Sequence, residues 1–289
     1  MSESPFTDLA RPPLNERALN RMLVRPESLW RRVRVVAETG STNVDLAEAA
    51  RRGEPEGAVL VAESQRAGRG RLGRSWTAPP RSGLTFSVLL RPPVEAAALG
   101  WLPLLTGLAA AEALRRVTGR VTEDLTEGSA RRNGRAAALD VRLKWPNDLM
   151  VGDRKLGGIL AERVGDAVVM GVGLNVSLRE EELPVPTATS LLLEGAAFRE
   201  REALLRAILR ELEDWYRRWT AQGGDAEGSG LRAAYRDLCA TLGRQVRVVM
   251  PGDQEITGRA ADVDAAGCLV VVTPEGEQTV GAGDVVHVR

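Results

Sequence analysis

The sequence predicts an α+β protein in which a mixed β-sheet flanked by helices is followed by a small C-terminal β-barrel. Short apolar segments typical of strands alternate with helical stripes over most of the 289 residues. Residues 243–289, in contrast, contain only short β patterns separated by Gly, Asp and Pro. We therefore expect an arm over residues 1–30, a large domain over residues 31–238 and the small barrel over residues 239–289.

Strands are expected wherever a short apolar run is bounded by turn-forming residues. The large domain contains a series of such runs, and the last two are expected to pair with each other. The runs span residues 33–37, 58–62, 84–90, 141–145, 155–162 and 167–176.

Helices are expected where apolar residues recur at helical spacing. Ser41 or Thr42 can cap the first helix of the large domain, which carries Leu46 and Ala50. Residues 95–118 suit a long, mostly buried helix whose most apolar part is too short to cross a bilayer. Further helical patterns lie at residues 14–23, at residues 200–220 and near Tyr235, whereas residues 120–135 are polar and are expected to form an insertion.

Composition excludes several classes of active site and partner. His287 is the single histidine, which rules out a Ser-His-Asp or Cys-His nucleophilic site, and Cys239 and Cys268 lie too far apart for a Cys-rich zinc site. The 39 basic residues balance the 39 acidic ones, which argues against a chain that coats nucleic acid or an anionic membrane. No signal-peptide pattern is present, so we expect a cytoplasmic protein.

Lys144 and Lys155 are the two lysines among the 39 basic residues, and all the others are arginines. A solvated surface accepts either cation, whereas a compact ammonium and a planar guanidinium are not interchangeable at a reacting centre. Lys144 ends an apolar strand, where its ammonium could stabilise charge that develops at an attacked phosphorus. The alternative is a surface lysine beside a turn, and the scarcity of lysine argues against it.

Residues 68–73, with the sequence Gly-Arg-Gly-Arg-Leu-Gly, match the dinucleotide-binding fingerprint. That motif must open a helix, and residues 74–80, which contain two prolines, cannot do so, so a Rossmann site is excluded. Neither lysine follows a glycine, so no Walker A loop is present. What remains is a flexible loop whose guanidinium groups suit phosphate or carboxylate and which an anion can close. From this segment alone, a solvated basic turn is an equally good interpretation.

Gly171 and Gly173 interrupt a predicted strand, which often marks the close approach of a ligand or a neighbouring chain. Asn175 follows them and could read a base edge or hold a metal. Ordinary packing between strands is the alternative at this segment.

Several motifs occur together in a fixed order: residues 40–43 (Gly-Ser-Thr-Asn), Gln65 before the arginine–glycine loop, residues 144–148 (Lys-Trp-Pro-Asn-Asp), residues 155–162 and residues 171–176. Through these motifs the chain resembles biotin protein ligases, in the form without an N-terminal DNA-binding domain. The resemblance runs from about Val33 to the C-terminus. It implies a biotin/lipoate ligase-like catalytic domain over residues 31–238 that binds biotin and ATP, and an SH3-like β-barrel over residues 239–289.

The resemblance also implies roles for residues at the matching positions. Catalysis is assigned to Lys144, Arg69 and Arg71. Biotin is expected to contact Ser41, Thr42, Asn43, Gln65, Arg69, Gly70, Arg71, Lys144, Gly157 and Gly171. ATP and the adenylate are expected to contact Arg69, Arg71, Arg74, Trp76, Lys144, Asn147 and Asn175, while Lys155 belongs to the pattern without an assigned role.

The activity that the resemblance implies agrees with the composition. The biotin carboxylate attacks the α-phosphate of ATP to give biotinyl-5′-AMP and pyrophosphate, and a lysine of a biotin carboxyl carrier domain of acyl-CoA carboxylase then displaces AMP. Both nucleophiles belong to substrates, so the enzyme needs no serine, cysteine or histidine, and positioning and charge stabilisation are enough. Mg²⁺ is expected to arrive with ATP, so no metal site built by the protein is predicted.

Two other functions compete with this one. A lipoate-protein ligase shares the catalytic fold, but the arginine–glycine loop and the Lys-Trp-Pro-Asn-Asp turn favour biotin. A non-enzymatic, biotin-responsive regulator is opposed by the balanced charge, and the arm before Val33 is too short for a winged-helix domain, so we expect no DNA binding. We expect no membrane association, and a monomer or a weak homodimer.

Overall fold

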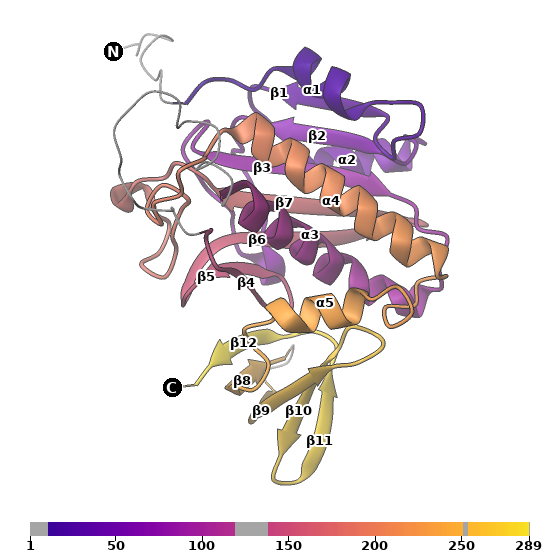
Figure 1. Cartoon of the computed structure of the whole chain (residues 1–289), viewed down its shortest axis with the longest axis vertical. Coiled ribbons are helices and arrows are strands. Elements are labelled where there is room, and N and C mark those ends of the chain that lie inside the picture. The colour runs from indigo at the N-terminus through magenta and orange to yellow at the C-terminus, as the bar shows by residue number, and fades with distance from the viewer. Residues whose placement is uncertain (1–10, 119–137, 251–253, 289) are drawn as a thin grey trace, which may run out of the picture.

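The computed structural model describes residues 11–118, 138–250 and 254–288. The predicted insertion at residues 120–135 lies outside the described residues. Within them, a seven-stranded sheet forms the larger body and a five-stranded sheet the smaller one, which lies below it in Figure 1. The predicted α+β architecture with a small all-β C-terminal part is therefore confirmed.

The large sheet is mixed, in the order β1-β2-β3-β7-β6-β5-β4. The first two strands pair in parallel and every other neighbouring pair is antiparallel. Side chains of strand β2 alternate between the two faces, as strand geometry requires, and both faces are covered. The strands are β1 (Arg32–Val36), β2 (Ala58–Ala62), β3 (Gly83–Leu90), β4 (Val141–Lys144), β5 (Asp148–Val151), β6 (Arg154–Val164) and β7 (Ala167–Asn175).

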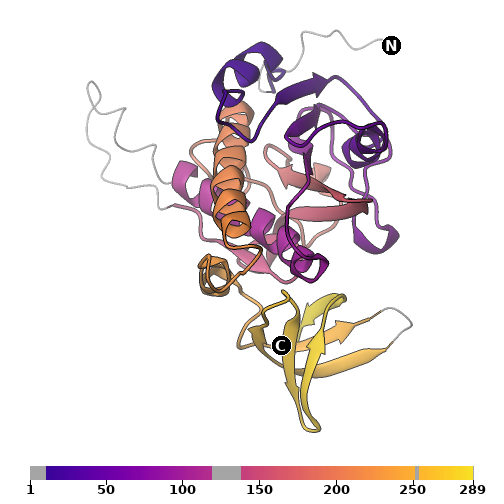
Figure 2. The same cartoon turned by 90° about the vertical axis from the view of Figure 1, so that its right-hand side faces the viewer.

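Helices cover the two faces of the sheet unequally. Helices α3 (Trp101–Thr118) and α4 (Arg201–Ala221) pack against each other and enclose the main core, as Figures 1 and 2 show. Helix α2 (Thr42–Arg51) packs on the opposite face, over a smaller core. The remaining helices are α1 (Glu16–Leu23) and α5 (Leu231–Leu238), with short 3₁₀ turns η1 (Arg71–Gly73), η2 (Ala96–Gly100) and η3 (Glu180–Glu182).

The helical segment Ala96–Thr118 is longer than its most apolar part suggested. It is apolar enough and, at 23 residues, long enough to cross a membrane, so the expectation that length excludes a span was wrong. However, 67% of its most apolar window is buried inside the structure, and Trp101, Leu105 and Leu108 are fully enclosed. The predicted buried core helix is thus confirmed.

The structure differs from the predicted elements at several ends. Ser41 occupies the N-cap position of α2, but its side chain makes no capping hydrogen bond. Strand β4 ends at Lys144 and not at Trp145, because a tight turn follows in which the Asn147 amide donates to the Lys144 carbonyl. No strand was predicted for the residues directly after that turn, whereas they form strand β5. The start of the helix predicted from residue 95 is the 3₁₀ turn η2.

The described part of the N-terminal arm is bound into the large domain. Glu63 and Arg201 form an ion pair of 2.5 Å in which both side chains are almost fully buried. The Leu14 amide donates to the Glu63 carboxylate at 2.6 Å, and Arg201 also donates to the Pro12 carbonyl at 2.6 Å. Together with Trp30, which lies in the main core, these contacts make residues 11–30 part of the large domain's packing.

The small sheet is antiparallel, in the order β11-β10-β9-β8-β12, and it docks onto the large domain through tryptophans. The indole N–H of Trp101 donates to the Ala265 carbonyl at 2.7 Å, and that of Trp145 donates to the Gly267 carbonyl at 3.0 Å. One turn of the small sheet therefore receives both indoles. The strands are β8 (Gln245–Val249), β9 (Glu255–Val263), β10 (Leu269–Thr273), β11 (Gly276–Val280) and β12 (Asp284–His287).

Candidate active site

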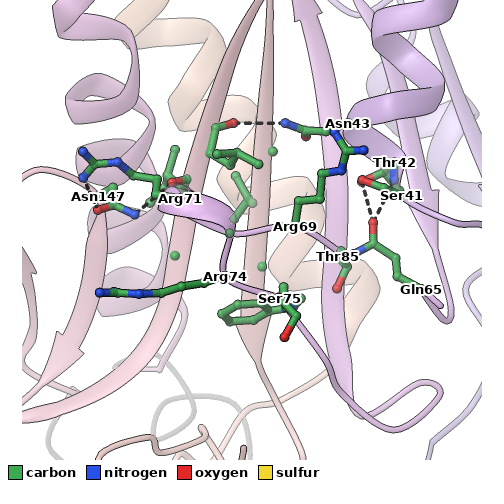
Figure 3. A pocket seen from close by; sticks show the side chains of 18 of the residues that line it. Ser41, Thr42, Asn43, Gln65, Arg69, Arg71, Arg74, Ser75, Thr85 and Asn147 are labelled. Carbon is green, nitrogen blue, oxygen red and sulfur yellow. Dashed lines mark hydrogen bonds between the residues drawn. The ribbon is translucent and has the colours of Figure 1, made fainter. Parts of the chain in front are cut away.

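A cavity of about 800 Å³, including its open mouth, lies on the α2 face of the large sheet (Figure 3). Its floor comes from strands β3, β6 and β7, one end from the start of α2, and its cover from the arginine–glycine loop, residues 66–76. Most of the predicted site residues line it: Ser41, Thr42, Asn43, Gln65, Arg69, Gly70, Arg71, Arg74, Trp76, Asn147 and Gly171.

The arginine–glycine loop folds as a tight hairpin over the cavity. The Gly70 amide donates to the Arg74 carbonyl at 2.7 Å, and the Trp76 amide donates to the Gly68 carbonyl at 2.8 Å. Leu72 has a φ of 55°, so the chain reverses through a left-handed residue, and its side chain is largely exposed. No helix follows the loop, which agrees with the exclusion of a Rossmann site.

Each loop arginine that lines the cavity has a polar partner across it. Arg69 lies 3.9 Å from Glu162, and Arg71 donates to the Asn147 side chain at 2.9 Å. Burial lowers the pKa of Arg71 below its ordinary value, although its guanidinium stays far from neutral at any physiological pH. A guanidinium that is partly desolvated and lightly partnered is well prepared to bind an anion.

Arg74 pairs with Asp284 at the start of β12, which brings the small sheet to the mouth of the cavity. The hydrogen bond with Asp284 raises the pKa of Arg74. Burial opposes ionisation of Asp284, but the hydrogen bond and charge of Arg74, with the charge of Lys144, outweigh it and lower the pKa of the carboxyl. The sequence contained no signal that a residue so near the C-terminus would reach this site.

A row of polar side chains crosses the floor at the α2 end. The Gln65 side-chain oxygen accepts from the Thr42 amide at 2.8 Å and lies 3.0 Å from the Thr42 hydroxyl. The Ser87 hydroxyl lies 2.7 Å from that of Thr42 and 2.6 Å from the Asn43 side-chain oxygen. The Asn43 amide donates to Glu162 at 2.8 Å, which completes the row. Figure 3 shows the Gln65–Thr42 end of it.

Two strand glycines make room for this arrangement. A Cβ on Gly171 would lie 2.1 Å from the Asn43 side-chain oxygen, and a Cβ on Gly173 would lie 2.4 Å from the nearest carbon of the Trp76 indole. Strand β7 therefore needs glycine at both positions because a side chain approaches its backbone. The expectation of close approach at these glycines is met by the protein's own side chains.

The two lysines differ in position relative to the cavity. Lys155 lines the cavity, and its ammonium lies 2.6 Å from the Asp148 carboxylate. Lys144 does not line the cavity; its charge acts on Asp284 and His287 of the small sheet. The strand turn after Lys144 explains the difference, because β5 and β6 carry the later lysine back to the site.

Gly157 and Asn175 were also expected in the site, and neither lines the cavity. Gly157 packs against the Gly173 carbonyl in the neighbouring strand, and the buried Asn175 amide donates to the Thr189 carbonyl at 2.9 Å. Both residues thus make contacts within the scaffold behind the cavity.

Several lining residues were not predicted. Thr85 lines the floor of the cavity, and Ser87 lies behind it. They are two polar residues, two positions apart, on an otherwise apolar strand, and this pattern was visible in the sequence. The other unpredicted lining residues are Leu72, Ser75, Phe86, Asp148, Lys155, Gly158, Ile159, Leu160, Val172, Gly173 and Asp284.

Family models match both parts of the chain. Residues 37–176 match the biotin/lipoate A/B protein ligase family, and residues 241–288 match the biotin protein ligase C-terminal domain. The first match includes the α2, loop and strand residues of the cavity, and the second includes the small sheet with Asp284.

Individual relatives extend the match to the whole chain. The biotin–[acetyl-CoA-carboxylase] ligase of Mycobacterium tuberculosis is 41% identical over 98% of both chains. The bifunctional ligase/repressor BirA of Escherichia coli is 33% identical over 83% of this chain and 68% of its own length. Biotin protein ligase from Aquifex aeolicus, solved in complex with biotin and ATP, superimposes with a TM-score of 0.69 at 28% identity, covering 90% of this chain and all of that one. The chain therefore belongs to the biotin protein ligase family.

Proposed function

We propose that this protein is an ATP-dependent ligase that activates biotin as biotinyl-5′-AMP and transfers it to a lysine of the biotin carboxyl carrier domain of acyl-CoA carboxylase. The observation that supports it best is the polar end of the cavity, where two side-chain oxygen atoms lie close to each other. They belong to Gln65 and Thr42, 3.0 Å apart. The ureido ring of biotin carries N–H donors for such oxygens, whereas the dithiolane ring of lipoate and the chain of octanoate carry none.

The first step needs a carboxylate to attack a phosphate although both are negatively charged. Lys155 lines the cavity and the charge of Lys144 acts on Asp284 at its mouth, and we propose that these two ammonium groups supply the charge stabilisation. A carboxylate oxygen of biotin bonds to the α-phosphorus of ATP while the bond to the bridging oxygen of pyrophosphate breaks. Arg69 and Arg71 neutralise the phosphate oxygens, and positioning supplies the rest of the rate.

Mg²⁺ fits this site as a partner of ATP. The Asp148 carboxylate lines the cavity and is an oxygen ligand of the kind that Mg²⁺ takes together with phosphates. When bound, the ion supplies neutralisation of the phosphate charge. Asp148 also holds the Lys155 ammonium, so it orients the lysine toward the cavity.

The second step transfers the biotinyl group. The amine of the carrier lysine attacks the carbonyl carbon of the mixed anhydride, the bond to the phosphate oxygen breaks, AMP leaves and the amine loses a proton. Until the carrier arrives, the arginine–glycine loop covers the anhydride and limits its hydrolysis.

We further propose that residues 31–238 act as the catalytic unit, with residues 1–30 as an arm and residues 239–289 as the small C-terminal domain. A reaction that consumes ATP and modifies a carboxylase is consistent with a cytoplasmic enzyme, and both described cysteines are free, as in reducing compartments. DNA binding is not part of the proposal, and a monomer or weak homodimer is expected; sedimentation of the apo and adenylate-bound protein tests the latter.

Pyrophosphate exchange with biotin, lipoate and octanoate offered in parallel tests the proposal. Exchange that depends on biotin, followed by a streptavidin shift of the carrier domain, is expected. Exchange with lipoate but not biotin would support a lipoate ligase, and biotin binding without any exchange would support a non-enzymatic regulator.

A further inference from the structure

The polar row on the cavity floor has too few protons for all of its contacts. Between Gln65 and Asn43 there are three oxygen–oxygen contacts, of 3.0, 2.7 and 2.6 Å, and they run through the hydroxyls of Thr42 and Ser87. Each hydroxyl carries one proton, so two protons serve three contacts. One contact must therefore lie between oxygens with no proton between them.

The atoms at both ends of the row are fixed as acceptors. The Gln65 atom accepts from the Thr42 backbone N–H at 2.8 Å, so it is the amide oxygen and not the NH₂ group. At the other end, the Asn43 NH₂ faces the Glu162 carboxylate at 2.8 Å and the Leu160 carbonyl at 3.4 Å. Two acceptors on that side hold the Asn43 amide with its oxygen toward Ser87.

The direction of the two hydroxyl protons follows. The contact between Ser87 and Asn43 is the shortest, at 2.6 Å, and two oxygens this close need a proton between them, so Ser87 donates to Asn43. The next contact, 2.7 Å, takes the Thr42 proton, which points to Ser87. The unprotonated contact is then the longest, 3.0 Å, between Thr42 and Gln65.

This direction decides what the cavity offers to a ligand. An amide oxygen has two lone pairs, and one on Gln65 is used by the Thr42 N–H. If the Thr42 hydroxyl also donated to Gln65, no lone pair would remain for a ligand. With the hydroxyl turned toward Ser87, Gln65 keeps one lone pair and Thr42 exposes its own.

We infer that Glu162 is a positioning residue for biotin recognition, acting through Asn43 and Ser87 to turn the Thr42 hydroxyl away from Gln65. Glu162 does not line the cavity, and its carboxylate reaches the Gln65 end of the cavity through this row. It is the member of the row that cannot donate when ionised, so it sets the direction of every hydrogen bond after it. The inference rests on the proposed function, because it takes the donor to be a ureido N–H of biotin.

Glu162→Gln is the direct test, since a glutamine amide can donate and lets Asn43 turn round. The dissociation constant for biotin, measured by calorimetry, is expected to rise about tenfold, the loss of one ligand hydrogen bond. In Ser87→Ala, which leaves the Arg69–Glu162 pair in place, the kcat at saturating biotin is expected to stay near that of the wild type. A biotin analogue methylated on the ureido nitrogens is expected to bind both proteins equally weakly.

A second route from Glu162 to the ligand runs through Arg69, and Ser87→Ala separates the two. Ser87→Ala cuts the row but leaves the Arg69–Glu162 pair in place. Its loss of biotin affinity is expected to equal that of Glu162→Gln, and the double variant is expected to lose no more than either single variant. Glu38→Gln is the matched control, because Glu38 pairs with the loop residue Arg66 at 3.3 Å outside the row.

Unchanged biotin affinity in Glu162→Gln, additive losses in the double variant, or an equal loss on the methylated analogue would overturn the inference. A wild-type protein that neither binds biotin nor exchanges pyrophosphate would contradict the proposed function itself, and this result is distinct from the three outcomes above. Circular dichroism of each variant confirms that affinity is compared between folded proteins.

Discussion

Arg74 and Asp284 are bonded side chain to side chain although 210 positions separate them in the chain. The guanidinium belongs to the loop that covers the cavity and the carboxylate to the first residue of β12. The small C-terminal sheet therefore contributes a charged group to the mouth of the site. A phosphate that binds Arg74 must therefore compete with the Asp284 carboxylate for the guanidinium or bind beside it.

Asp284→Asn is expected to cost less than about 1 kcal/mol of unfolding free energy at neutral pH, because both side chains are substantially exposed, at 62% and 38%. The lowered pKa of Asp284 gives the sign of the pH dependence. The stabilisation by the Arg74–Asp284 pair is complete above the unfolded-state pKa of about 3.9, and it is lost as the pH falls through the lower pKa of the folded state. Urea unfolding at a series of pH values should show the two proteins converging between about pH 5 and about pH 3. A difference in unfolding free energy between the two proteins that grows as the pH falls would contradict this.

Lys155→Arg is expected to leave the protein folded and to reduce biotin-dependent pyrophosphate exchange about 100-fold or more, because a planar guanidinium cannot replace the ammonium beside Asp148. Lys144→Arg is the parallel test, since the charge of Lys144 acts on Asp284 at the mouth of the cavity, and it is also expected to lower the exchange rate. Near-normal exchange in either variant would exclude that lysine from the reaction.

Gly171→Ala and Gly173→Ala are expected to damage different ends of the site. Neither glycine has a positive φ, so alanine is acceptable to the backbone, and only space decides. Alanine at 171 meets Asn43 and should raise the KM for biotin, whereas alanine at 173 meets the Trp76 indole and should change its fluorescence and raise the KM for ATP. Overpacking of this kind costs about 1–3 kcal/mol. If each variant raised the KM for biotin and the KM for ATP to the same extent, the biotin end and the ATP end of the site would not be separable.

Arg201→Met is expected to destabilise the protein by about 3–5 kcal/mol, because it leaves the buried Glu63 carboxylate without its cation. The double variant Glu63→Gln with Arg201→Met should recover much of that loss, since a glutamine oxygen can still accept from the Leu14 amide. Urea unfolding of the three proteins measures the cycle. A double variant no more stable than Arg201→Met would indicate that the pair is not the source of the loss.

Most strands and helices could be predicted because each has its own recurring pattern of apolar residues. Strand β2 has the predicted bounds, and helix α4 differs from its prediction by one residue at each end. Strand β5 was missed because it is short and follows a turn directly, so no separate apolar run marks it. Burial of the Glu63–Arg201 pair was not predictable, since its two members are distant in sequence.

The site was predictable where motif and geometry coincide, as for Thr42, Gln65 and Arg71. Lys144 and Lys155 share one motif region, and only the antiparallel return of β6 shows which of them faces the cavity. The scarcity of lysine marked both positions but could not rank them. Asp284 entered the site by tertiary contact alone, which no local pattern reports.

The indoles of Trp101 and Trp145 both donate to one turn of the small sheet, and Trp145 is itself the second residue of the Lys-Trp-Pro-Asn-Asp turn. The boundary between the two family matches therefore does not separate two structurally independent parts of the chain. We expect that loosening of the C-terminal sheet disturbs the turn that carries Asn147 and Asp148, because Trp145 belongs to that turn. A fusion partner attached to the C-terminus is therefore expected to perturb the catalytic turn more than one attached far from both indoles.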